Sequence, residues 1–108
     1  MLIIDAEIQF DTDKNKPSAL AKDLDTKNVI RPAINFGNGM LFSGDIIPIE
    51  NVQMLIRGQN YNVSIDMLTI EDEAYEAIQN LVKVGNKFLI QNASRVIGRG
   101  TIKEFVFE

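Results

Sequence analysis

The chain has 108 residues, 45% apolar and 24% charged, a composition typical of one folded domain spanning residues 1–108. It contains no Cys and no His, which excludes disulfides, thiol nucleophiles, Cys/His zinc sites and His-based catalysis. Its net charge of -4 disfavours general nucleic-acid binding, because phosphates require a positively charged face. We therefore expect no cofactor and no metal ion.

The sequence shows no sign of membrane insertion. A membrane-spanning helix needs roughly 20 consecutive apolar residues, and no segment here comes near that length. The N-terminus lacks the basic residues and the long apolar run of a signal peptide. We therefore expect a cytoplasmic protein that does not associate with membranes.

Most of the chain has the two-residue alternation of strands. Residues 2–10 alternate apolar and polar side chains, which predicts a first strand with one buried face. Residues 11–28 carry four acids and four bases around Pro17, which predicts a long surface loop, mobile rather than functional. Alternation then returns in residues 29–36, 40–47, 52–56 and 61–68, and the second of these segments is expected to bend around Gly44.

A single amphipathic helix is predicted at about residues 69–84, where apolar residues recur every three or four positions. Thr69 is positioned to cap its N-terminus, and Gly85 is positioned to end it. Two last strands follow at residues 87–91 and 95–107. The result is a mainly all-β fold, an antiparallel barrel or sandwich with one inserted helix.

The acidic residues do not form a recognisable catalytic or metal site. The cluster from Glu71 to Glu76 is explained by the first turn and the solvated face of the helix. The acidic stretch that begins at Asp11 resembles the start of a calcium loop but lacks its Gly at position six and its Glu at position twelve. Because no residues have the spacing of a nucleophile and its base, we expect a protein that is not an enzyme.

Basic residues gather in the last third of the chain. Arg95, Arg99 and Lys103 are spaced by four, so in a regular strand they share one face, with Lys87 on the neighbouring strand. Such a basic stripe could contact an acidic partner or an RNA backbone. The alternative is a solvated outer face whose charges oppose edge aggregation.

Three parts of the chain, residues 30–46, 52–60 and 87–100, resemble in the same order parts of the C-terminal, third domain of translation elongation factor Tu. Residues 30–36 are similar to the Tyr-Arg-Pro-Gln-Phe strand of that family, and residues 42–46 follow as its Gly-containing strand. Residues 52–60 are similar to the family's Val-Glu-Met-Val-Met-Pro-Gly-Asp-Asn segment, and residues 87–100 are similar to its last hairpin without a gap. The family has no long helix before that hairpin, and residues 11–28 lack its Gly-Gly-Arg-His segment.

The resemblance implies a six-stranded antiparallel Greek-key barrel with the helix inserted. It also implies kinship to a surface that in the full factor contacts the GTPase domain, the exchange factor and the T-stem of aminoacyl-tRNA. Arg31 corresponds to a tRNA contact of the family, and Arg95 also matches a family cation. Most other charged donors are replaced, so much of the phosphate affinity should be lost.

We therefore expect a non-catalytic binding domain whose partner is a protein, with a role in translation. The predicted contact set is Arg31, Lys87, Arg95, Arg99 and Lys103. One alternative is an RNA-binding module, with tRNA as the RNA, acting through the Arg95/Arg99/Lys103 stripe. Another is an immunity or antitoxin-like inhibitor that covers a basic target with its acidic helix. Self-association also stays open, since small barrels with exposed edges often form oligomers.

Overall fold

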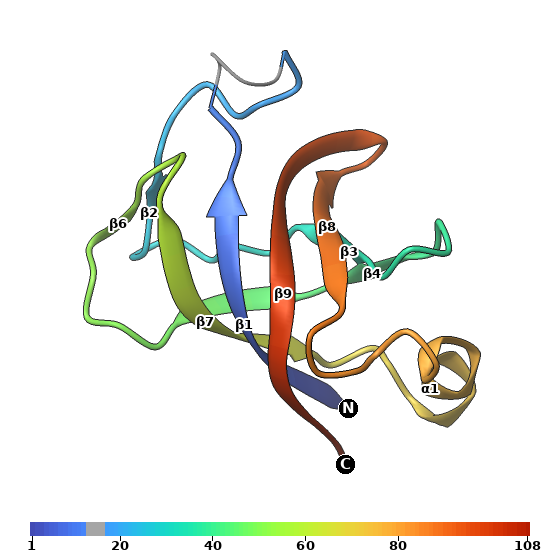
Figure 1. Ribbon diagram of the computed structural model, residues 1–108. Helices are drawn as coiled ribbons and strands as arrows, with labels where there is room; N and C mark the ends of the chain where they lie inside the picture. Colours follow the sequence, from blue (N-terminus) through green and yellow to red (C-terminus); the bar gives the residue numbers. More distant parts are fainter. Residues whose placement is uncertain (13–16) are drawn as a thin grey trace.

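The computed structural model describes residues 1–12 and 17–108 and is predominantly antiparallel β-structure with one helix in that part of the chain (Figure 1). The elements are β1 (Leu2–Phe10), β2 (Leu24–Asp25), β3 (Ala33–Asn35), β4 (Leu41–Ser43), β5 (Asp45–Pro48), β6 (Met54–Leu55), β7 (Asn60–Met67), α1 (Asp72–Ile78), β8 (Lys87–Asn92) and β9 (Arg95–Phe107). The prediction of a mainly β fold is therefore confirmed.

Seven strands form one curled sheet, a half-barrel, in the order β4-β3-β8-β9-β1-β7-β5. All of its strand pairs are antiparallel. The two strands at the ends of this order, β4 and β5, are consecutive in the sequence, with only Gly44 between them. β2 and β6 form a separate two-stranded sheet, close to each other in the same view (Figure 1).

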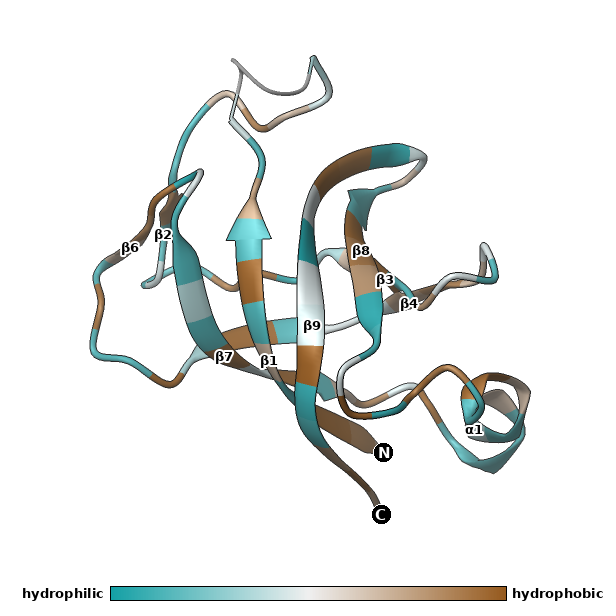
Figure 2. Cartoon of the chain, viewed as in Figure 1, coloured by the Kyte–Doolittle hydropathy of each residue, from teal (hydrophilic) through white to brown (hydrophobic). Residues whose placement is uncertain are grey.

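The core lies on the concave side of this sheet. The alternation in residues 2–10 predicted one buried face for the first strand, and this prediction is confirmed. Every second residue of β1 is buried, and the residues between them are half-buried. β7 continues the same pattern, so brown and teal bands alternate along both strands in Figure 2. Burial of one face of each strand stabilises the curled sheet around a common apolar interior.

The predicted bend at Gly44 is confirmed, and the packing explains why glycine stands there. A Cβ atom at this position would lie 2.7 Å from Cγ2 of Ile65 and 3.3 Å from Cγ1 of Ile34. The backbone at the bend therefore rests directly on the core. The Gly44 N–H donates to the carbonyl of Pro32 at 3.0 Å, which ties the bend to the segment before β3.

The helix is shorter than predicted. α1 spans Asp72–Ile78, and its N-cap residue is Glu71, whose side chain makes no capping hydrogen bond. Thr69 is not the cap, because a turn closed by a hydrogen bond from the Ile70 N–H to the Met67 carbonyl precedes the helix. Turns after Ile78 bury Val82 and so continue the apolar spacing of three and four residues beyond the helix itself. The described residues contain no helix that is long and apolar enough to cross a membrane.

The segment predicted as a long surface loop is attached to the half-barrel over much of its described length. Residues 13–16, which belong both to the predicted loop and to the rejected calcium motif, lie outside the described residues. In the rest of it β2 pairs with β6, and Ala19 is buried. Arg57 donates to the Leu20 carbonyl, and Arg95 donates to the Ala19 carbonyl. Polar composition suggested a free connection, but arginines elsewhere in the chain hold its backbone.

Candidate functional site

The outer face of the half-barrel carries two rows of side chains, all polar except Leu89, that cross several strands. Because side chains alternate along a strand, the residues between the core positions of β1 point to this face. The first row runs Lys87, Thr101, Glu7 and Asn62 across β8, β9, β1 and β7. The second row runs Asn35, Leu89, Arg99, Gln9 and Asn60, beginning one strand earlier on β3.

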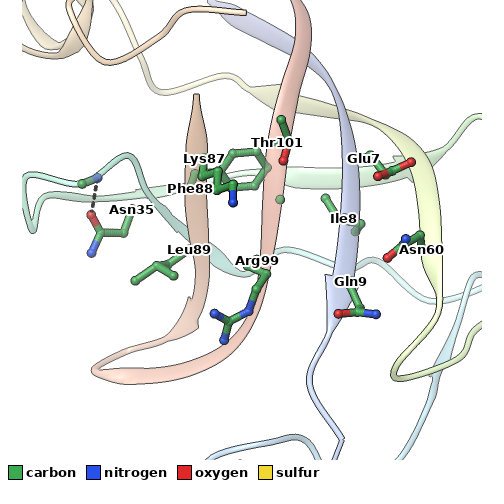
Figure 3. A pocket seen from close by; sticks show the side chains of 12 residues that line it. Glu7, Ile8, Gln9, Asn35, Asn60, Lys87, Phe88, Leu89, Arg99 and Thr101 are labelled. Carbon is green, nitrogen blue, oxygen red and sulfur yellow. Dashed lines mark hydrogen bonds between the residues drawn. The ribbon is translucent and has the colours of Figure 1, made fainter. Parts of the chain in front are cut away.

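The residues of these two rows, except Asn62, line a hollow of about 430 Å³. Figure 3 shows their side chains around it, with Lys87 and Arg99 on one side and Glu7 and Asn60 on the other. Leu89 adds apolar surface to the lining. The hollow therefore combines two cations, one carboxylate and amide groups with an apolar wall, which is the mixture that binding sites commonly present.

Arg99 is held in this hollow by a carboxylate that sequence reasoning did not connect with it. Asp11 follows β1 and is buried, and its Oδ2 accepts a hydrogen bond of 3.0 Å from Nη2 of Arg99. Its Oδ1 is 3.4 Å from Nε of Arg99. A fork of contacts to one carboxylate fixes the plane of the guanidinium, so Arg99 is oriented before any ligand binds.

Lys87 is exposed, and none of the described residues forms a hydrogen bond or an ion pair with its ammonium group. It stands beside Thr101 in the first row, and Glu7 follows on the next strand. Lys87 and Arg99 therefore lie in adjoining rows and line the same hollow. Of the five predicted contact residues, these are the two that the fold brings together there.

Arg95 faces a different environment. The pairing of β8 with β9 shifts between Ile90 and Gln91, so Ile97 is an extra residue on β9. Such a bulge interrupts the two-residue alternation on which the predicted stripe depended. The guanidinium of Arg95 donates to the carbonyls of Ser18 and Ala19, so it fastens the segment after residue 16.

Lys103 lies at a second irregularity. The pairing of β1 with β9 shifts between Asp5 and Ala6, which makes Lys103 the extra residue. Its side chain is exposed, on the part of β9 that continues past β8. The uninterrupted alternation predicted from Arg95 to Lys103 is therefore wrong, because two bulges fall within those nine residues.

Arg31 lies before β3 and is paired with a carboxylate. Its Nε is 2.5 Å from Oδ1 of Asp45, and this hydrogen bond, together with the negative charge, raises the pKa of Arg31. With Ser43 and Asp66 it lines a separate hollow of about 230 Å³. Arg31 therefore does not join Lys87 and Arg99.

The acidic helix surface makes few contacts. Glu71 approaches the N-terminal ammonium group at 3.9 Å, and the other acids of the cluster, Asp72, Glu73 and Glu76, are exposed. Among the described residues, no three or more Asp and Glu side chains gather in a way that could hold a metal ion.

Sequence reasoning missed several residues of the hollow. The alternation of β1 could have shown Glu7 and Gln9, because they occupy its polar face. Nothing local marks Asp11 as the partner of Arg99, since 88 positions separate them. Asn60 and Thr101 join the hollow only through the strand register.

Comparison with known proteins adds no assignment. No family model matches the chain, and a search of curated proteins finds no match. The resemblance to elongation factor Tu therefore stays a prediction from the residues quoted for it.

Proposed function

We propose that this protein is a non-catalytic binding domain related to the third domain of elongation factor Tu. Its binding face is the pair of polar rows across β8, β9 and β1, and its partner is a protein, in the translation apparatus of the cytoplasm. The observation that carries the proposal is the hollow of about 430 Å³. In it Lys87, which has no partner among residues 1–12 and 17–108, lies in the row next to Arg99, which Asp11 orients.

The same proposal includes the finer fold, a six-stranded Greek-key barrel. What supports it is the position of β4 and β5 at the two ends of the strand order, with Gly44 alone between them. Counted as one bent strand, they pair with β3 on one half and with β7 on the other. A sheet whose two ends belong to one strand is a closed barrel of six strands.

The charges around the hollow favour a protein partner over RNA. Glu7 lines the hollow together with Lys87 and Arg99. Asp11 lies outside the lining but pairs with Arg99, so two carboxylates balance these two cations. Binding of a phosphate backbone draws its free energy from cations that are free to replace counterions. Arg95 and Arg31 are engaged within the chain, which removes two more cations from that role.

A partner with isolated charges suits this face better. A single acidic side chain could pair with Lys87 or Arg99, while its neighbours cover Leu89 and the amide groups of Gln9 and Asn60. Protein interfaces combine apolar contact with a few directed polar contacts in this way. The alternative inhibitor function of the acidic helix gains no comparable support, because none of the Glu71–Glu76 side chains lines the hollow of Lys87 and Arg99 or the hollow of Arg31 and Asp45.

The proposal is tested by affinity capture with a matched pair of variants. Lys87→Glu reverses a charge in the hollow, whereas Lys83→Glu makes the same change on an exposed lysine outside it. Proteins captured by the wild type and by Lys83→Glu, but lost with Lys87→Glu, support this face. Identification of such a protein by mass spectrometry as a translation component supports the assigned process. Equal capture by all three forms refutes the face.

A further inference from the structure

The C-terminal part of β9 leaves one edge of the sheet open. β9 pairs with β8 from Arg95 to Thr101 and then continues past β8, where it pairs with β1 alone (Figure 1). The last backbone hydrogen bonds on the β8 side of β9 are made by Ile102. Its carbonyl accepts from the Gly85 N–H, and its N–H donates to the Asn86 carbonyl. Beyond Ile102, none of the described residues pairs with this edge of β9.

The hydrogen bonds between β9 and β1 show which backbone N–H and C=O groups of β9 point away from β1. The N–H of Glu108 donates to the Met1 carbonyl at 2.9 Å, and the Met1 ammonium donates to the Glu108 carbonyl at 2.9 Å. In an antiparallel pair, hydrogen-bonded and non-bonded residue pairs alternate. Val106 and Glu104 therefore bond to β1, while the N–H and C=O groups of Phe105 and Phe107 face away from it.

Three consecutive side chains on this edge, at residues 105–107, are apolar, and the first two of them are accessible. Phe105 is 36% exposed and Val106 is 47% exposed. Phe107 stacks on Tyr75 of α1, with 4.0 Å between the ring centroids. An open edge with unpaired backbone groups and apolar side chains is a template for one more strand.

We propose that a second copy of this chain supplies that strand, through antiparallel pairing of β9 with itself around Val106. In this register Phe105 exchanges both backbone hydrogen bonds with Phe107 of the second copy, and Phe107 does the same with Phe105 of the second copy. The N–H and C=O groups of both residues are then satisfied on each copy. It also sets Val106 against its own equivalent. The stacked pair of Phe107 and Tyr75 then meets Phe105 from the second copy, which joins aromatic rings across the interface.

The alternative register around Phe105 is less favourable. It bonds Phe105 to its equivalent but sets Phe107 opposite Lys103, where the bulge distorts the backbone. The register around Val106 has its own cost, because Glu104 then lies opposite Glu108 of the second copy. Like charges directly across a strand pair are destabilising. This cost makes the proposal testable with a variant that strengthens the dimer.

Sedimentation of the full chain over a wide range of concentration tests the proposal. We expect the mean mass to rise towards twice that of one chain. Glu104→Gln removes the like charge and should lower the dissociation constant about tenfold, whereas Val106→Glu should raise it at least tenfold. Both side chains are exposed, so the fold of one copy should persist. Lys87→Glu should leave the dissociation constant unchanged, which separates this proposal from the binding face.

Amide hydrogen exchange identifies the edge directly. On dimerisation the amides of Phe105 and Phe107 should become protected, whereas those of Glu104 and Val106 are protected at every concentration because they bond to β1. A constant mass of one chain at all concentrations overturns the proposal. A dimer that Val106→Glu does not weaken, or one that leaves both Phe amides exchanging freely, overturns it equally, since another surface then forms the interface.

Discussion

Arg99 and Asp11 form an ion pair with 3.0 Å between Nη2 and Oδ2, and the two partners differ in burial: Asp11 is 6% exposed and Arg99 is 45% exposed. Loss of the arginine leaves a buried carboxylate without its partner, whereas loss of the carboxylate leaves a guanidinium that water can reach. We therefore expect Arg99→Gln to lower the free energy of unfolding by about 1–3 kcal/mol, and Asp11→Asn to lower it by less. Urea unfolding of both variants measures this order, and equal or reversed costs would contradict it.

Gly100 has no room for a side chain. A Cβ atom there would lie 2.4 Å from Cζ of Phe88 and 2.9 Å from Cγ2 of Ile8. Gly100→Ala should therefore cost about 1–3 kcal/mol of stability through overpacking. In the double variant Gly100→Ala/Phe88→Leu the clash with the ring is absent. The loss in free energy of unfolding of the double variant should therefore be smaller than the sum of the losses of the two single variants. Strict additivity in urea unfolding would indicate that the ring does not cause the strain.

The N-terminus of α1 can be improved. Glu71 is the N-cap residue, and its side chain makes no hydrogen bond to the first turn. Aspartate is among the best N-cap residues because its shorter side chain reaches the backbone N–H groups, so Glu71→Asp should stabilise the protein by about 0.5–1 kcal/mol. The control is Glu76→Asp within the helix, where the same substitution should not stabilise. Thermal unfolding that shows no difference between the two variants would argue against this cap position.

Asp23 should give the protein a specific acid sensitivity. The backbone N–H of Arg57 and then its guanidinium hold the pKa of Asp23 below its ordinary value of 3.8. A carboxyl whose pKa is lowered by folding contributes stability above its unfolded pKa, and that contribution is lost as the pH falls through the folded pKa. The stability difference between wild type and Asp23→Ala should therefore be constant near neutral pH and shrink in that acidic range. A difference that stays constant to the lowest pH at which both fold would exclude this role.

Alternation along the sequence predicts the strands well and the basic stripe poorly. The reason is that such a pattern depends only on neighbouring residues, whereas the stripe also depends on how strands pair. Alternation in β1 marks one buried face, and that depends only on neighbours in sequence. The bulges at Ile97 and Lys103 depend on how β9 fits two partner strands at once, which no local pattern records. The helix was overestimated at Thr69 because the turn before it and the turns after Ile78 bury residues at helical spacing.

Long-range polar contacts were the other unpredictable feature. Arg95 was expected on the outer face, but it donates to the backbone of the segment that contains Ser18 and Ala19. Arg99 was expected there too, and it does line the hollow, although its orientation comes from Asp11. Tertiary contacts therefore decide which cations are engaged within the chain. Arg31 and Arg95 are engaged in this way and Lys87 is not, among the described residues, and this difference is visible only in the fold.

The binding face is tested most directly by mapping it with the captured partner. The partner that Lys87→Glu fails to capture is titrated into the isotope-labelled wild-type protein, and backbone amide shifts are followed by NMR. The largest changes should fall on the two rows, at Lys87, Leu89, Arg99, Thr101 and the polar positions of β1. Changes confined to α1 or to the β4–β5 bend, with those rows unaffected, would contradict the proposed face.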